Sequence, residues 1–233
     1  MDGVMAKASM VGFLMRRGRP REIAGMARRF WQSEVQYLGF KREMSVPFTA
    51  PSARIPLTVG KLQLSDVATL LDTRDPALDP DEKIVRLWQR KLVTAGLETC
   101  YVARTPAGVP CYMQFLIGPV ELPRAIAFYG DQFPKLGPGE VILEGAFTPA
   151  EFRGQGIMPA AMAQISEAAA RNGAKTLITF VANDNVPALK GCRRAGYSPY
   201  VARTRRWTHF RRSFSSSSLL EGTPDRPEPV TAA

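Results

Sequence analysis

The residues best placed to do chemistry form one short turn between an apolar strand pattern and a long helix pattern, Glu151-Phe152-Arg153-Gly154-Gln155-Gly156-Ile157-Met158. The two glycines allow tight backbone geometry and close approach of a ligand. At the start of the helix, backbone N–H groups lack intrahelical acceptors, and the helix dipole and Arg153 add positive potential. These features predict a phosphate cradle, the alternative being a plain strand-to-helix connection.

Residue types elsewhere argue against several other kinds of site. The turn matches neither GxxxxGK[ST] nor GxGxxG, which argues against a nucleoside triphosphate or dinucleotide site. The three cysteines form no CxxC pair and the one histidine is His209, so we expect no metal, reduced thiols and a cytoplasmic protein. We find no run of about twenty uncharged apolar residues, so we expect no transmembrane helix.

Two motifs resemble those of the GNAT superfamily of acyl-CoA N-acyltransferases. Residues 153–157 follow Phe147-Thr148-Pro149 and are similar to the family's pyrophosphate motif Q/R-x-x-G-x-G/A. Downstream, Asn185 and Ala188 followed by Gly196-Tyr197 are similar to its N-x-x-A…G-F/Y pattern in order and spacing.

The resemblance extends more loosely over residues 54–214 and implies a fold, a reaction and a co-substrate. The reaction is transfer of an acetyl or other acyl group from acyl-CoA to an amine in a ternary complex, without a metal. The fold is α/β, with a mixed, mostly antiparallel sheet of about six or seven strands flanked by helices. The strand before the turn would splay from its neighbour and leave a cleft for pantetheine. The implied cofactor-binding residues are Ala146, Phe147, Thr148, Arg153, Gly154, Gln155, Gly156, Ile157, Met158 and Asn185.

Acyl transfer needs a base for the amine and a proton for the departing sulfur. Glu140 and Glu144 are four positions apart on an otherwise apolar strand, so strand alternation points both to one face. Glu144 is the candidate general base, the alternative being a structural ion pair with an arginine. Glu140 is the second candidate, with simple exposure at the strand start as the alternative. Tyr112 and Gln114, on an earlier strand, are candidates for the acceptor side, with core packing as the alternative.

The proton donor for the sulfur has several candidates. Cys192 falls where many family members carry the tyrosine that protonates the CoA thiolate, with inert burial as the alternative. Tyr197 and Tyr200 are further candidates. Met158 replaces the usual Gly or Ala of the motif, and its flexible side chain can point away from the helix turn.

The chain is basic, with 31 Lys and Arg against 21 Asp and Glu and a net charge of +10. This balance favours anionic partners. Residues 1–53 are expected to form an N-terminal extension with a basic amphipathic helix over 20–38. This helix is expected to pack on the main domain, the alternatives being that it binds a membrane surface or an acidic acyl carrier protein. The acceptor is expected to be a small-molecule or lipid-linked amine. The alternatives are carrier-protein-dependent transfer and a catalytically inactive module that binds acyl-CoA or, least favoured, nucleic acid through the arginine-rich run 203–212.

The pattern of elements completes the prediction. The catalytic domain is expected over 54–214 and a disordered tail over 215–233. Strands are expected over 55–59, 98–103, 109–117, 140–147, 176–181, 197–202 and 205–214, and helices over 65–71, 79–92, 158–172 and 185–195. The helix from residue 79 carries one apolar side that we expect to be buried, formed by Ile84, Leu87, Trp88 and Leu92.

Overall fold

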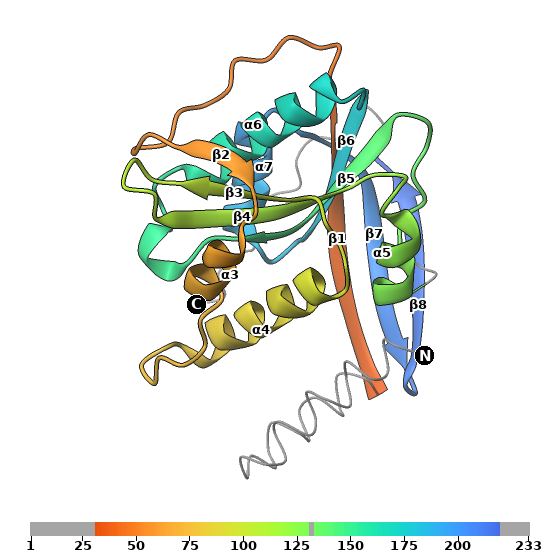
Figure 1. The fold of residues 1–233 in the computed structure, drawn as a ribbon. Coiled ribbons are helices and arrows are strands. Elements are labelled where there is room, and N and C mark those ends of the chain that lie inside the picture. The colour runs from red at the N-terminus through yellow and green to blue at the C-terminus, as the bar shows by residue number, and fades with distance from the viewer. Residues whose placement is uncertain (1–30, 131–132, 220–233) are drawn as a thin grey trace, which may run out of the picture.

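The structure is a computed structural model and describes residues 31–130 and 133–219 (Figure 1). The elements follow in the order β1 (Gln32–Glu43), β2 (Thr58–Lys61), α3 (Leu64–Leu70), α4 (Pro80–Thr94), β3 (Cys100–Arg104), β4 (Pro110–Ile117), α5 (Leu122–Tyr129), β5 (Glu140–Phe147), α6 (Ile157–Arg171), β6 (Thr176–Ala182), α7 (Val186–Arg194), β7 (Ser198–Thr208) and β8 (Arg211–Ser218). A 3₁₀ turn over Ala150–Phe152 connects β5 to the glycine turn.

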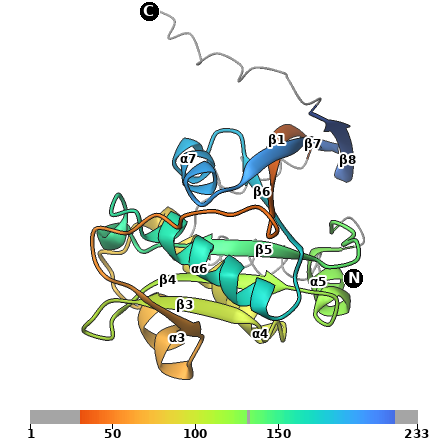
Figure 2. The ribbon, with the colours of Figure 1, turned by 90° about the horizontal axis from the view of Figure 1, so that it is seen from above.

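In the described part of the chain, the strands form one eight-stranded sheet in the order β2-β3-β4-β5-β6-β1-β7-β8. Every neighbouring pair is antiparallel except β5 and β6. The sheet is strongly twisted, so β2 to β4 cross the direction of β1, β7 and β8, with α6 on one face and α3 and α4 on the other (Figures 1 and 2). Each face has its own apolar core. The predicted mixed, mostly antiparallel sheet flanked by helices is confirmed, with more strands than expected.

The two parallel strands separate halfway along their length. β5 pairs with β6 only over residues 140–142 and 176–178. Beyond this point Gly145 has a φ of +63° and the pairing of β5 with β4 changes register, which marks a bulge. Because the bulge bends β5 away from β6, the edges of both strands face a gap. The predicted splay of the strand before the glycine turn is therefore present.

The N-terminal part of the sheet differs from the prediction. Of the helix expected over 20–38, residues 20–30 lie outside the described residues, and residues 32–38 belong to β1. β1 is inserted between β6 and β7 and pairs with both. The helix prediction is therefore wrong from residue 32, because two neighbouring strands outweigh the weak helical spacing of its apolar residues. The sheet also begins well before residue 54.

The C-terminal residues form a hairpin rather than one strand followed by a tail. The strand expected over 205–214 is divided by a two-residue turn at His209 and Phe210, which have φ of 50° and 64°. Two central residues with positive φ are typical of a tight hairpin turn. β8 continues to Ser218, so the disordered tail predicted from residue 215 is wrong as far as 218; residues 220–233 lie outside the described residues.

Helix α4 buries a polar face, contrary to expectation. Of the predicted apolar side, Leu92 is buried as expected and Leu87 is half-buried, but Ile84 and Trp88 are exposed. The other buried residues of α4 are Glu82, Arg86 and Gln89. These polar groups are stable inside because they bind one another or the sheet: the Glu82–Arg86 ion pair measures 2.7 Å, and Gln89 Nε2 donates to the Gly145 carbonyl at 3.0 Å. α4 therefore holds the bulge of β5. None of the described helices is long and apolar enough to cross a membrane.

Candidate active site

A cleft of about 900 Å³ opens where β5 and β6 separate. One wall is β5 from Leu143 to Thr148, and the other is β6 from Thr179 to Ala182. The glycine turn and the start of α6 close one end, and α7 lies along the side. Most of the cofactor-binding residues predicted from the family resemblance line this cleft: Ala146, Phe147, Thr148, Arg153, Gly154, Gly156, Ile157, Met158 and Asn185.

The glycine turn is open toward the cleft. Gly154 and Gly156 have φ of +75° and +74°, which side chains rarely adopt, and a Cβ on Gly154 would meet nothing within 4 Å. Gly156 is the N-cap of α6, so the N–H groups of Ile157 and Met158 have no intrahelical acceptor. Gln155 is the exception among the predicted residues: its carbonyl accepts from the Arg54 amide at 2.9 Å, and its side chain bonds the Glu151 carbonyl at 3.2 Å. The turn fits a diphosphate through backbone amides.

Arg153 is committed to the protein rather than free for an anion. Its guanidinium pairs with Glu82 Oε2 at 2.9 Å and donates to the Thr148 carbonyl at 3.0 Å. Because Glu82 also binds Arg86, Arg153 ties the turn to α4. Its predicted contribution to the cofactor site is therefore mainly to position the turn.

Two exposed cations on α7 supply positive charge that the sequence reading missed. Lys190 and Arg194 are one helical turn apart, and both line the cleft. Arg194 Nη2 lies 3.6 Å from the place where a Cβ on Gly156 would sit. The signal in the sequence was their spacing of four on the helix that Asn185 begins, where the Asn185 Oδ1 accepts from the Ala188 amide at 3.2 Å.

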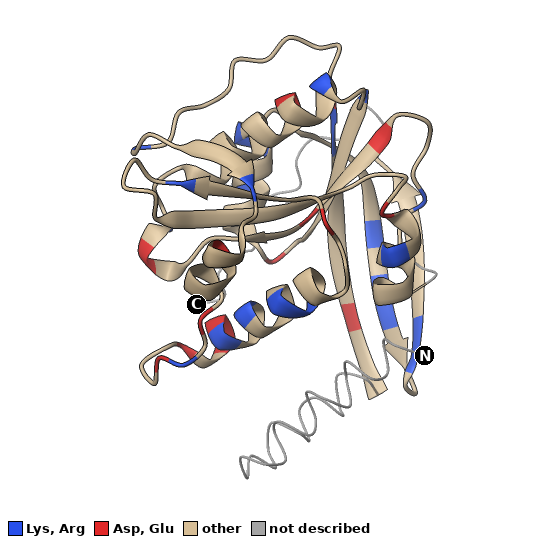
Figure 3. Ribbon diagram, in the orientation of Figure 1, with Lys and Arg blue, Asp and Glu red and all other residues tan. Residues whose placement is uncertain are grey.

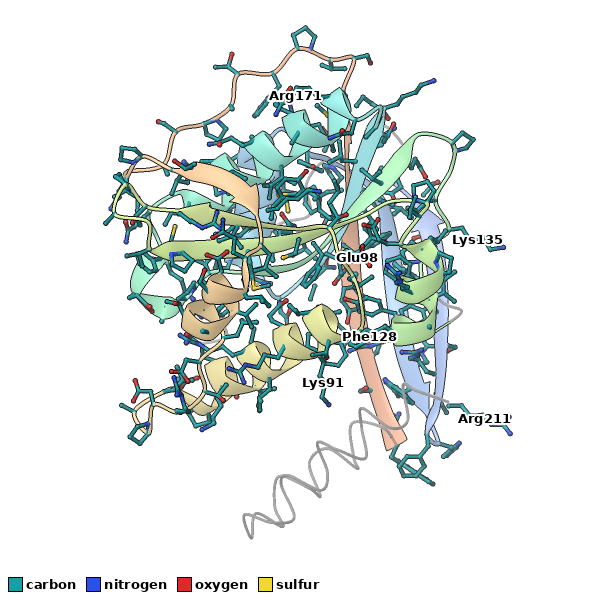
Figure 4. All side chains as sticks on the ribbon, viewed as in Figure 1. Lys91, Glu98, Phe128, Lys135, Arg171 and Arg211 are labelled. Atoms are coloured by element: carbon teal, nitrogen blue, oxygen red, sulfur yellow. The ribbon has the colours of Figure 1, made fainter. Side chains whose placement is uncertain are left out.

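We expect the double substitution K190Q/R194Q to weaken acetyl-CoA binding about tenfold, because two cations near the phosphates are lost. Isothermal titration should also show a weaker dependence of binding on salt. R171Q is the control, because Arg171 is an exposed cation at the far end of α6 (Figure 4). If K190Q/R194Q and R171Q lose the same amount of acetyl-CoA affinity, the overall positive charge of the protein, rather than these two side chains, attracts the cofactor.

Glu144 lies in the cleft, at the point where β5 leaves β6. Burial raises its pKa to about 7, while a hydrogen bond from the Gly145 backbone partly offsets this. Burial raises the pKa values of Tyr37 and Tyr129, and the charge of Glu144 raises both further, so both tyrosines lie near the carboxylate. A carboxylate with this pKa is suited to accept a proton near neutral pH.

Two other catalytic candidates, Glu140 and Tyr197, and the one histidine, His209, lie elsewhere. Glu140 accepts from the Gly137 amide at 2.7 Å at the start of β5 and does not line the cleft. Tyr197 is buried in the core, where its hydroxyl bonds Ser166 Oγ at 2.7 Å, and it does not line the cleft either. His209 packs edge-on against Trp31 in the distal hairpin turn. The structure thus separates Glu144 from these groups.

Cys192 of α7 lines the cleft together with Tyr112 and Gln114 of β4. Burial raises the pKa of Cys192 to about 12, so its thiol is protonated at neutral pH. The Tyr112 hydroxyl donates to Gln114 Oε1 at 2.7 Å, and the charge of a Cys192 thiolate would raise the Tyr112 pKa. Met158 points toward Gly191 of α7, where its Sδ lies 2.9 Å from the place of an added Cβ. The larger Met is therefore accommodated by a glycine on the facing helix.

The sheet with its split parallel pair and the glycine turn that opens α6 form a GNAT-like fold. Residues 116–197 match the model of the acetyltransferase (GNAT) family. No curated protein matches the sequence.

Solved structures are similar to this chain at low identity. The glucosamine N-acetyltransferase region of a fungal multi-domain GH3 β-N-acetylglucosaminidase is 17% identical with a TM-score of 0.52, over 81% of this chain and 22% of that one. A GCN5-related N-acetyltransferase from Sphaerobacter thermophilus (12% identity, TM-score 0.47) is matched over 84% of this chain. A GNAT-family acetyltransferase from Colwellia psychrerythraea (14% identity, TM-score 0.47) is matched over 75%. This chain spans 56% of the length of each of the two bacterial proteins.

Proposed function

We propose that the protein transfers an acyl group, acetyl in the simplest case, from acyl-CoA to an amine by direct attack in a ternary complex. The observation that carries this proposal is the cleft of about 900 Å³ between β5 and β6, closed by a glycine turn with outward-facing amides. Pantetheine would lie along residues 146–148 and the diphosphate on the amides of 154–158. CoA is the donor we propose, since the cleft and the glycine turn lie together in the described residues and fit its pantetheine and diphosphate.

The experiment that tests this proposal is isothermal titration of the full chain with acetyl-CoA and CoA, followed by release of the CoA thiol in the presence of an amine panel. We expect binding in the micromolar range. A protein that binds neither compound at millimolar concentration is not an acyl-CoA enzyme. Binding without release for any amine would favour an acyl-CoA-binding module instead.

In the proposed reaction, the amine nitrogen attacks the thioester carbonyl and the carbon–sulfur bond breaks. Glu144 takes a proton from the nitrogen, because it is the carboxylate in the cleft with a pKa of about 7. Cys192 is not needed as an acyl carrier, since its buried thiol is not ionised and a thiol attacks as the thiolate. The proton for the departing sulfur is assigned to Tyr112, whose hydroxyl is buried at the cleft beside Cys192.

We therefore expect Y112F to lower kcat about tenfold to a hundredfold, with acetyl-CoA affinity nearly unchanged, because it removes only the proton donor. C192A is the matched control from the same part of the cleft and should keep kcat within about threefold. Steady-state kinetics on both variants makes the comparison. The opposite ranking would move the acid role to Cys192, where the sequence placed it.

A further inference from the structure

A second, smaller cavity of about 340 Å³ adjoins the cleft, and Phe180 of β6 lines both. It lies against β7, β8 and residues 133–135. Because Phe180 lines both spaces, the second cavity lies next to the cleft, within reach of a small molecule bound there.

The walls of the cavity combine aromatic rings with two cations. Phe133, Phe180 and Tyr200 form the apolar part, and Lys135 and Arg203 bring positive charge. Lys135 is exposed on the side of the molecule that β7 and β8 form (Figure 4), and basic residues recur along β7 (Figure 3).

Arg203 is held in place by the rings around it. Its guanidinium carbon lies 4.3 Å from the centroid of Phe214 and 5.6 Å from that of Phe180. Burial lowers the Arg203 pKa, because the charged guanidinium is partly desolvated there. Glu144 lines the neighbouring cleft, as Phe180 does.

We propose that this cavity binds the anionic end of the acceptor, which is therefore an amine that also carries a carboxylate or phosphate on an aromatic or apolar body. This inference rests on the proposed function. The guanidinium of Arg203 and the ammonium of Lys135 pair with the anion, the rings contact the body, and the amine extends past Phe180 toward Glu144. Arg206, three residues after Arg203 on β7, is ion-paired with Glu34 at 2.6 Å and does not line the cavity.

The test measures binding of simple probes to the full chain by ligand-observed NMR titration. The probes are 3-phenylpropanoate, phenyl phosphate and the neutral 3-phenylpropanamide. We expect at least one anion to bind about tenfold more tightly than the amide. K135Q and R203Q should each remove most of that preference, R203K should keep part of it, and R206Q should leave it intact. Whichever of the two anions binds more tightly, the carboxylate or the phosphate, identifies the anionic group that the acceptor carries.

Two outcomes overturn the inference: equal binding of the anions and the amide, or an anion preference that neither K135Q nor R203Q reduces. Lys135 is exposed, so K135Q tests the proposal without disturbing the fold even where R203Q loosens the packing on Phe180. Acetyl-CoA titration of the same samples separates this result from the proposed function. Loss of the anion preference with normal acetyl-CoA binding refutes only the acceptor class, whereas absent acetyl-CoA binding refutes the enzyme assignment.

Discussion

Replacing Glu144 by Gln is expected to reduce kcat about a hundredfold or more, because the amine then loses its general base. Acetyl-CoA affinity should change by less than about twofold, since the glutamine keeps the size of the side chain. Steady-state kinetics with acetyl-CoA and an accepted amine gives the first quantity, and isothermal titration gives the second. E140Q is the matched control on the same strand, and its activity should stay near that of the unaltered protein.

The pH profile gives an independent readout of the same residue. Glu144 acts as a base only when ionised, so the rate should fall as pH decreases through about 7. In E144Q this fall in rate should be absent, and only the pH dependence that comes from ionisation of the amine should remain. If E144Q shows the same fall in rate near the same pH, the titrating group is a residue other than Glu144.

Unfolding experiments separate this loss of activity from a folding defect. The Glu144 pKa is raised in the folded protein, so the folded state binds the proton more tightly than the unfolded chain does. Ionised Glu144 therefore destabilises the fold, progressively as pH rises from about 4.5 toward 7. E144Q should raise the midpoint of thermal unfolding at about pH 8 and have little effect near pH 4.

Replacing Gly154 by Asp is expected to weaken acetyl-CoA binding about a hundredfold, because it puts a carboxylate beside the diphosphate cradle. Gly173→Asp is a close control: Gly173 has a φ of +91° against +75° at Gly154, and a Cβ on either glycine would meet nothing within 4 Å. Both substitutions carry a similar backbone strain, but Gly173 follows α6 at the end away from the cleft.

Isothermal titration of both variants with acetyl-CoA makes this comparison, with thermal unfolding run in parallel. Similar losses of stability with a large loss of affinity in G154D alone would support the cradle. If both variants bind acetyl-CoA normally, the diphosphate does not lie on this turn, and the direction of the cofactor in the cleft would have to be reassigned.

The glycine turn and the elements next to it could be predicted from the sequence. β5 was expected over 140–147 and has those bounds, and α6 and β6 fall within one residue of expectation. Local preferences decide such elements: β-branched runs favour strands, and the glycines permit the positive φ that ends one element and begins the next. The asparagine that caps α7 is recognisable for the same reason.

The insertion of β1 into the sheet could not be predicted from such local preferences. Residues 32–38 alternate between the two faces of a strand, but they are polar enough that a helix was the stronger local reading. Pairing with β6 and β7, about 140 to 170 residues away, decides their structure, and such contacts leave little trace in local composition. The polar buried face of α4 was missed similarly, because its partners come from distant elements.

By itself, the sequence determined the glycine turn, the strand before it and the helix after it, because steric preference and helix capping act between neighbouring residues. The tertiary structure alone decided which charged groups share the site. It brought Lys190 and Arg194 to the cleft, placed Glu144 there without Glu140, tied Arg153 to Glu82, and set Phe180 between two cavities. These outcomes depend on distances between segments that come together only when the sheet closes. A local pattern such as the spacing of Lys190 and Arg194 shows that two side chains share a helix face, but not which site that face lines.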